Sequence, residues 1–162
     1  MATATGTREV PVGRQLVWRS LTYLSTYCPV CDVSYVFDDS ARGGGQVIGR
    51  GSRFVCVPGR LDGRKPPPNA AAGVIVEWAE QRRIGTRLEL ASETWQTRIE
   101  LGDVDPGSTH VTVTVTREPK GGSPLLHHLQ RRSMRRLVQH TVDSELAKLP
   151  DHITAVHDDG VA

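Results

Sequence analysis

Residues 123–149, SPLLHHLQRRSMRRLVQHTVDSELAKL, form the longest regular pattern in this sequence and decide its fold. Ser123 is a favourable helix N-cap and Pro124 suits the first helical position, while Pro150 predicts that the helix ends at Leu149. A helix with an apolar stripe must bury that stripe on another element. The strands that precede it should therefore form a sheet against which the helix packs.

The apolar stripe of this predicted helix changes direction along its length. In the first half, one face carries three leucines and a serine: Leu126, Leu129, Ser133 and Leu137. In the second half, the apolar face consists of Val138, Val142, Leu146 and Leu149. The two halves should therefore cover different parts of the molecule. We expect the first half to close over a cavity and the second half to seal the core.

The rest of the sequence mainly predicts strands and turns. Alternating apolar and polar residues predict strands over 5–12, 33–37, 46–57, 73–80, 83–93, 95–103 and 109–118. Helical spacing predicts a short helix over 14–27, an Asp- and Gly-rich stretch predicts a turn over 38–45, and proline-rich residues 58–71 predict a loop. We expect one α+β domain over 1–151, with a curved antiparallel sheet of about seven strands gripping the long helix. Residues 152–162 read as a disordered tail.

Composition limits the classes of function. The chain has 162 residues, a formal net charge of +2 and three cysteines, which suits one domain and does not suit a disulfide scaffold. No apolar run resembles a signal peptide or could span a membrane. We therefore expect a cytoplasmic protein, without membrane insertion. A composition rich in Arg, Ala and Gly with few lysines indicates a high-GC bacterial genome.

Five segments, taken in order, resemble the START-like superfamily, also called SRPBCC or helix-grip proteins, of the polyketide cyclase/dehydrase type. They are 10–27 with Val17-Trp18, 47–51, 76–80 running into Arg83-Ile84, 107–111 and 125–149. The resemblance covers residues 5–150 and includes the order of the elements. It departs at 27–31, where the family often has a tryptophan and this chain has Tyr-Cys-Pro-Val-Cys.

The resemblance implies a deep, mostly apolar cavity between the sheet and the C-terminal helix. Within the family such cavities bind lipids, hormones or polyketide intermediates. We therefore expect a hydrophobic or aromatic small molecule as the partner, without a cofactor. An alternative is a polyketide cyclase or dehydratase that holds a reactive chain in one conformation while a polar side chain assists proton transfer.

Apolar side chains of the predicted strands and helix are the candidate ligand-binding residues. They are Phe54, Trp78, Leu88, Leu90, Trp95, Ile99, Val113, Met134 and Leu137. His140 and Arg53 are the candidate catalytic residues, and Tyr35 and His110 are further polar groups that would orient a ligand in such a pocket. The alternative for each residue is an ordinary place in the core or on the surface.

Cys28 and Cys31 have the spacing of half a zinc site or of a redox pair. A zinc site needs about four ligands, and the sequence offers Cys56 as a third without a further close pair. We therefore expect ordinary thiols and no metal, with a local disulfide as an alternative. Gly43 to Gly45 lack the pattern of a phosphate-binding loop and predict a hairpin turn.

The long helix also carries a basic face, formed by His127, His128, Arg131, Arg132 and Arg135. Such a face is usually solvated, and the alternative is an interaction surface for an acidic partner. The net charge of +2 and the absence of interleaved aromatic residues argue against nucleic acid. The sequence does not predict an oligomeric state.

Overall fold

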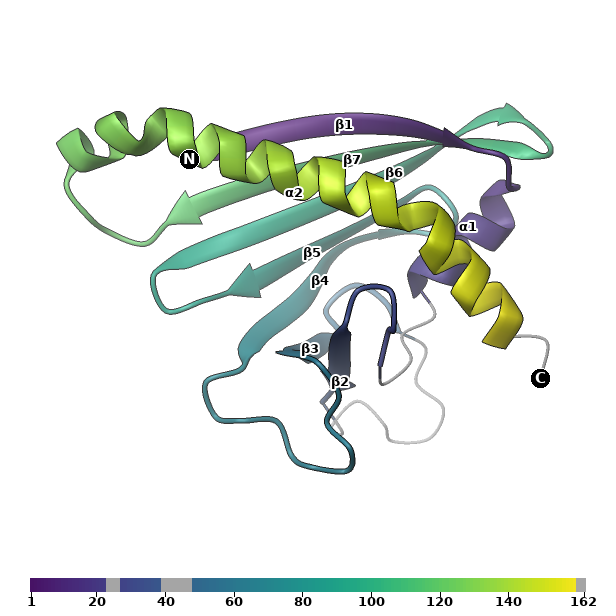
Figure 1. Ribbon diagram of the computed structural model, residues 1–162, viewed down its shortest axis with the longest axis horizontal. Coiled ribbons are helices and arrows are strands. Elements are labelled where there is room, and N and C mark those ends of the chain that lie inside the picture. Colours follow the sequence, from purple (N-terminus) through teal and green to yellow (C-terminus); the bar gives the residue numbers. More distant parts are fainter. Residues whose placement is uncertain (23–26, 39–47, 160–162) are drawn as a thin grey trace.

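The computed structural model describes residues 1–22, 27–38 and 48–159. One antiparallel sheet and one long helix dominate it (Figure 1). The elements in chain order are β1 (Ala2–Val10), α1 (Arg14–Thr22), β2 (Val33–Phe37), β3 (Arg53–Pro58), β4 (Ala71–Ala79), β5 (Arg83–Glu89), β6 (Glu93–Asp105), β7 (Ser108–Pro119) and α2 (Pro124–Asp159). This order confirms the predicted α+β, helix-grip class.

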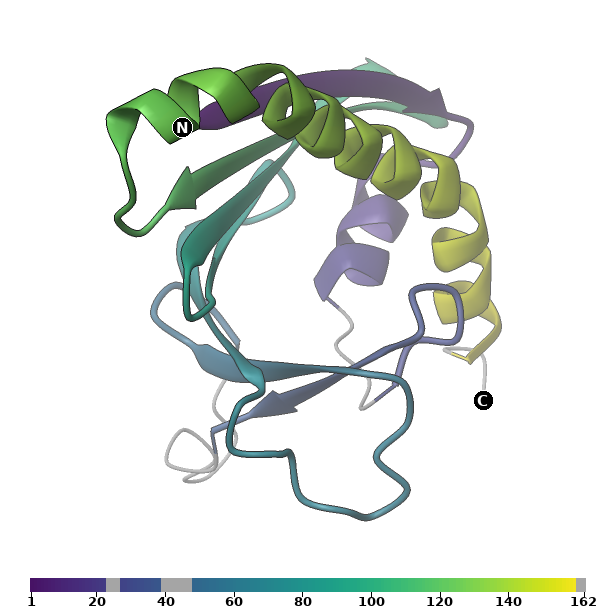
Figure 2. The same ribbon diagram turned by 60° about the vertical axis from the view of Figure 1, so that its left-hand side comes forward.

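The seven strands lie in the order β1-β7-β6-β5-β4-β3-β2, and every neighbouring pair is antiparallel. The sheet is strongly curved, and α2 crosses its concave side (Figure 2). In β4 the register with β5 shifts between Ile75 and Glu77. A bulge of this kind bends a strand, so it helps to turn β3 and β2 toward the helix.

Strand β7 shows why the sheet has one core face. Val111, Val113 and Val115 are buried, whereas the alternating threonines lie on the other face. Two of these threonines form hydroxyl–hydroxyl hydrogen bonds of 3.1 Å with β1, Thr114 to Thr5 and Thr116 to Thr3. The period of two along the sequence therefore decides which side chains face the helix.

Several predicted boundaries differ from the structure. The first strand begins at Ala2 and ends at Val10, and α1 ends at Thr22, with 23–26 outside the described residues. Residues 46 and 47 of the strand predicted over 46–57 lie outside the described residues, and β3 begins at Arg53. Gly51 precedes it with a φ of 90°, in a turn that Ser52 N closes on the Gly49 carbonyl at 3.1 Å. The predicted turn over 38–45 lies almost wholly outside the described residues.

The second half of α2 packs directly on β1 and β7. Its buried residues are Val138, Val142, Leu146, Leu149 and Ile153. The approach is closest at Gly6, where an added Cβ would lie 2.7 Å from Val142 Cγ1 and 2.8 Å from Leu146 Cδ1. Glycine at this position lets the helix lie against the backbone of β1. The prediction that this half seals the core therefore agrees with the burial pattern.

Helix α2 does not end at Leu149, so the predicted end was wrong. Pro150 lies inside the helix. Because proline has no N–H, the Leu146 carbonyl four residues earlier loses its helical donor. Arg8 of β1 replaces that donor, with Nη1 donating a hydrogen bond of 3.0 Å to the Leu146 carbonyl. The helix can therefore continue with this backbone oxygen satisfied.

The expected disordered tail over 152–162 is wrong for residues 152–159, which are helical, and 160–162 lie outside the described residues. Ile153 is buried and belongs to the hydrophobic core. Leu149, Ile153 and Val156 repeat at spacings of four and three, which continues the apolar face of the helix. This packing stabilises the turns beyond the proline.

We expect Arg8→Met to lower the free energy of unfolding by about 1 kcal/mol, because it leaves the Leu146 carbonyl without a donor. In a Pro150→Ala background the loss should be smaller, because an N–H at position 150 can then reach this carbonyl. Urea denaturation of the four proteins in this double-mutant cycle measures the difference. An equal loss in both backgrounds would show that Arg8 does not compensate for the proline.

Candidate ligand-binding site

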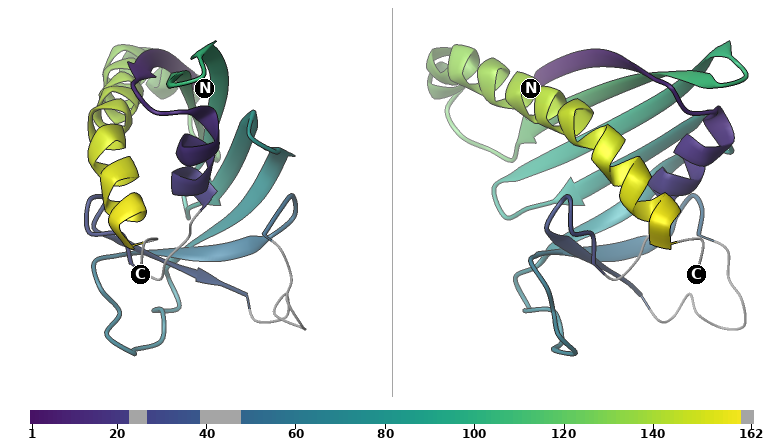
Figure 3. Two further views of the ribbon diagram at one scale, coloured as in Figure 1. Left: turned by 90° about the vertical axis from the view of Figure 1, so that its right-hand side faces the viewer. Right: turned by 45° about the vertical axis from the view of Figure 1, so that its right-hand side comes forward.

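A cavity of about 350 Å³ lies between the concave face of the sheet and the second half of α2. Figure 3 shows α2 and the strands on opposite sides, with α1 between them. The sheet contributes mostly apolar and aromatic walls, including Phe37, Phe54, Ile84, Leu88, Trp95 and Ile99. The helix contributes a more polar wall, with Thr141, Glu145, Lys148 and His152 beside Leu149 and Val156.

Five of the nine candidate ligand-binding residues line this cavity: Phe54, Leu88, Trp95, Ile99 and Val113. Phe54 is buried over Gly73, where a side chain would collide with its ring. Tyr35 also lines the cavity and meets Phe54 edge-on at a ring separation of 5.7 Å. The structure thus brings together the aromatic residues of β2, β3 and β6 that lie far apart in the sequence.

The other four candidates lie elsewhere. Trp78 packs edge-on against Trp18 of α1, with ring centroids 5.0 Å apart. Leu90 follows the end of β5, and its carbonyl accepts a hydrogen bond from Lys120 Nζ at 2.8 Å. Met134 and Leu137 belong to the first half of α2 and do not line the cavity. Trp78 and Met134 pack against the core instead.

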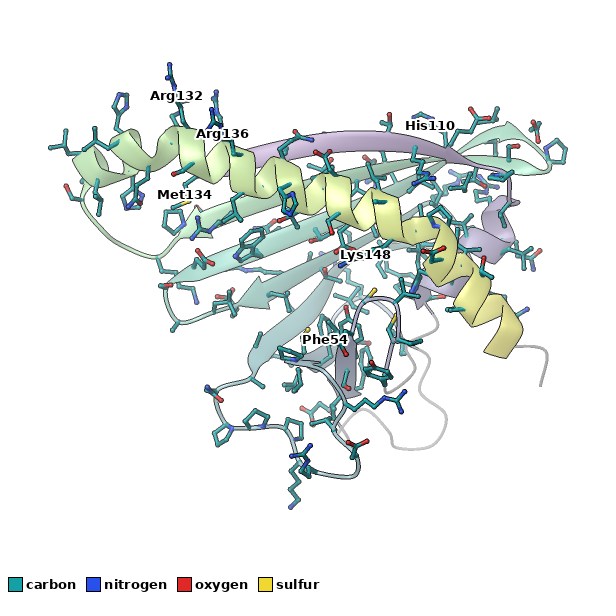
Figure 4. All side chains as sticks on the ribbon, in the orientation of Figure 1. Phe54, His110, Arg132, Met134, Arg136 and Lys148 are labelled. Carbon is teal, nitrogen blue, oxygen red and sulfur yellow. The ribbon has the colours of Figure 1, made fainter. Side chains whose placement is uncertain are left out.

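The expectation that the first half of α2 roofs the cavity is wrong. Its stripe is solvent-exposed, with Leu126, Leu129 and Leu137 at 50%, 73% and 45% of their full accessibility. Figure 4 shows Met134 on the sheet side of this half, whereas Arg132 and Arg136 point away from the sheet. The roof is formed by the second half, which both packs on β1 and faces the cavity. An apolar stripe predicted for a helix does not show how far the sheet extends beneath that helix.

Among the four polar candidates, one lines the cavity and three lie on the surface. His140, Arg53 and His110 are exposed and do not line the cavity; Figure 4 shows His110 near the β6–β7 hairpin. Tyr35 lies in the wall, and burial raises the pKa of its phenol. A neutral phenol at this position can donate one hydrogen bond to a ligand.

Sequence reasoning missed a cluster at one end of the cavity, formed by Cys28, Cys31 and His152. Cys28 Sγ lies 3.3 Å from His152 Nδ1, and the Cys31 N–H donates to Cys28 Sγ at 3.4 Å. Burial, followed by the hydrogen bond with Cys28, raises the pKa of Cys31 to about 12. The helical spacing of Leu149, Ile153 and Val156 was the signal that could have placed His152 on α2.

The wall at Trp95 is held by an ion pair. Trp95 Nε1 donates to Glu93 Oε1 at 2.8 Å, Arg117 bonds to the same carboxylate, and the guanidinium carbon lies 5.6 Å from the Trp95 ring centroid. Burial opposes ionisation of Glu93, but the hydrogen bonds from Trp95 and Arg117 outweigh it and hold the pKa of this carboxyl below its usual range. Arg117 also contacts Met134, which ties the first half of α2 to the cavity wall.

A second, more open hollow of about 320 Å³ lies under the first half of α2. Basic side chains and methionines line it, including Met1, Arg117, His127, His128, Arg131 and Met134. The arginines of the predicted basic face, Arg131, Arg132 and Arg135, are exposed. An acidic protein partner for this face stays a prediction.

No family model matches this sequence, and no curated protein matches it. Solved structures do match over nearly the whole chain. A START superfamily protein from Mycobacterium smegmatis has a TM-score of 0.64 and 14% identity, over 96% of this chain and 99% of that one. Zhui aromatase/cyclase from Streptomyces sp. R1128 has a TM-score of 0.66 and 12% identity, over 96% and 93%. The chain has the START-like fold. Norcoclaurine synthase from Thalictrum flavum, with a TM-score of 0.62 and 11% identity over 98% and 95%, is a further match.

The START-like fold accounts for the position of the cavity between the curved sheet and the C-terminal helix. At these identities the likeness concerns the fold, and the chemistry of the site must be argued from the residues of this chain. Neither helix of the described part of this START-like chain has a stretch long and apolar enough to cross a membrane.

Proposed function

We propose that this START-like protein binds a hydrophobic or aromatic small molecule, lipid-like or polyketide-like, in the cavity under α2. The observation that carries the proposal is the cavity itself, about 350 Å³ in volume and walled largely by apolar and aromatic side chains. Small-molecule sites commonly have volumes of about 300–1,000 Å³ with a few polar groups that orient the ligand. A small domain that left such a space empty would forgo the packing that normally stabilises a core.

The distribution of polarity indicates how the ligand lies. Its apolar body would contact Phe54, Trp95 and Ile99 on the sheet, and its polar end would face Tyr35, Glu145 and Lys148. Glu145 and Lys148 are three residues apart and therefore lie on one side of α2. An amphipathic ligand with a single polar end can make apolar contacts with the sheet and polar contacts with the helix.

The test is native mass spectrometry of the untagged protein, followed by organic extraction and identification of the bound molecules. A panel of fatty acids and polycyclic aromatic phenols is then titrated against a fluorescent apolar probe, anilinonaphthalene sulfonate, bound to the folded protein. We expect a co-purifying molecule and saturable one-to-one displacement of the probe by members of the panel. Absence of both would overturn the proposal.

A second candidate function, cyclisation or dehydration of a bound polyketide-like chain, is supported by the titratable groups at the polar wall. Tyr35, Glu145 and Lys148 face a space that also has aromatic walls, which can hold a reactive chain folded while a side chain moves a proton. Glu145→Gln and Lys148→Met should lower kcat for a synthetic poly-β-ketone more than they weaken its binding. Unchanged turnover in both variants would leave binding as the function.

We further propose a reducing cytoplasm as the working compartment. All three cysteines lie within the described residues and are free thiols. Free thiols beside a ligand cavity persist where thiol–disulfide systems keep them reduced.

A further inference from the structure

The cluster at the polar end of the cavity has the composition and size of a zinc site. The ligand atoms of Cys28, Cys31 and His152 all lie within 4.8 Å of one another. Tetrahedral zinc with Zn–S of about 2.3 Å and Zn–N of about 2.0 Å separates two sulfurs by about 3.8 Å and a sulfur from a nitrogen by about 3.5 Å. The 3.3 Å between Cys28 Sγ and His152 Nδ1 is close to that value. We propose that these three residues bind one Zn²⁺ ion.

The two cysteines are held by a tight backbone turn. Cys28 N donates to the Val33 carbonyl at 2.9 Å, and the two residues form an isolated antiparallel bridge. Asp32 has a φ of 51°, in the left-handed region, so the chain reverses immediately after Cys31. The Cys31 N–H lies 3.4 Å from Cys28 Sγ. The turn therefore holds the two cysteine sulfurs close enough together to share one metal ion.

The histidine is oriented by its other nitrogen. His152 Nε2 lies 2.8 Å from the carbonyl oxygen of buried Ser20. A carbonyl only accepts, so Nε2 carries the proton and the lone pair of Nδ1 faces the cysteines. This second hydrogen bond is the arrangement that metal-binding histidines usually have. The histidine comes from α2, the cysteines from the segment before β2, and the carbonyl from α1, so folding alone assembles the set.

The site has room for a further ligand. All three residues line the cavity, and three protein ligands leave the fourth tetrahedral position for water or for an oxygen of a bound molecule. Two cysteines and one histidine with an open position form a known type of zinc site. The sequence-based expectation of no metal arose because His152 was assigned to a tail, so that only Cys56 was considered as a third ligand.

The inference stands apart from the proposed ligand-binding function, because it concerns zinc alone. The rival interpretation is a disulfide between Cys28 and Cys31, which needs an external oxidant. Zinc and a disulfide exclude each other, since a disulfide offers no thiolate. The experiments are therefore done with a phosphine reductant present.

The experiment uses the untagged protein, freed of metal with a chelator, loaded with Zn²⁺ and desalted. Inductively coupled plasma mass spectrometry then measures the number of zinc ions bound per chain. We expect about one ion for the wild type, and less than about a tenth of an ion for Cys28→Ser, Cys31→Ser and His152→Gln, because each removes a ligand. Cys56→Ser is the matched control, since Cys56 lies on β3 outside the cluster, and it should keep about one ion.

Cobalt substitution of the wild-type protein supplies a readout that does not depend on a variant's folding. Co²⁺ bound by two thiolates and one imidazole gives thiolate-to-cobalt charge transfer in the near ultraviolet and strong visible bands from a four-coordinate ion. Loss of these bands in Cys28→Ser and His152→Gln, with thermal melts that still show cooperative unfolding, supports the site. No bands in the wild type, or equal loss of zinc in Cys56→Ser, would overturn it.

Discussion

Replacing Thr97 by Trp should weaken binding of anilinonaphthalene sulfonate at least about 100-fold, equivalent to about 2.7 kcal/mol of binding free energy. Thr97 lies in the middle of β6, and its side chain lines the cavity. An indole at this position would extend from the sheet wall, where Thr97 lies between Trp95 and Ile99 along β6, and fill the space that the probe needs. The measurement is a fluorescence titration at constant protein concentration.

The matched control for this experiment is Gln96→Trp. Gln96 is the preceding residue of the same strand, is exposed, and therefore places its side chain on the opposite face of the sheet. This variant should bind the probe as the wild type does. Near-ultraviolet circular dichroism of both variants establishes that each is folded. Equal weakening by the two substitutions, or full binding by a folded Thr97→Trp, would show that the cavity is not where the probe binds.

Replacing Gly6 by Val should lower the free energy of unfolding by about 3 kcal/mol, because overpacking a tight contact typically costs about 1–3 kcal/mol or more. An added Cβ at Gly6 would meet Val142 and Leu146 at less than 3 Å. Helix α2 would then have to move away from β1, and the buried face of its second half would lose contact. For a domain of this size, the melting temperature should fall by roughly 6–12 °C.

This prediction can fail in an informative direction. Valine has a higher strand propensity than glycine and restricts the unfolded chain, so without the steric contact Gly6→Val would stabilise the protein. Thr7→Val is the control, since Thr7 is the adjacent residue of β1 and is exposed. Thermal and urea unfolding of the two variants separate the effects. A rise in stability for Gly6→Val would contradict the close packing of α2 on β1.

The parts of the fold that depend on local pattern could be predicted from the sequence. The alternation of Val111, Val113 and Val115 with threonines specifies both a strand and its buried face, and the apolar spacing of Val138, Val142 and Leu146 specifies the helix face that packs. Each of these patterns extends over only a few residues, so it can be recognised from a single sequence. The five candidates that line the cavity were found for the same reason, as inward-facing residues of strands.

The errors arose where a distant residue decides the local structure. Pro150 predicts a helix end, but Arg8, from the opposite end of the chain, donates to the Leu146 carbonyl, and Ile153 packs in the core beyond the proline. The wrong end then removed His152 from consideration and left Cys28 and Cys31 without a third partner. The exposed leucines of the first half of α2 were misplaced because the sequence does not specify how far the sheet extends beneath the helix. Each of these features depends on tertiary contacts, which a local sequence pattern does not show.

The hydrogen bond between Arg8 and Leu146 joins residues 138 positions apart, and this separation has a consequence for the order of folding. Contacts between distant residues form slowly, because the loop between them must close first. The central hairpins of the sheet can pair early, whereas the last turns of α2 must wait for β1 to dock along β7. We therefore expect the polar end of the cavity to be the last part of the protein to close, so that a folding intermediate keeps it open to a ligand or an ion.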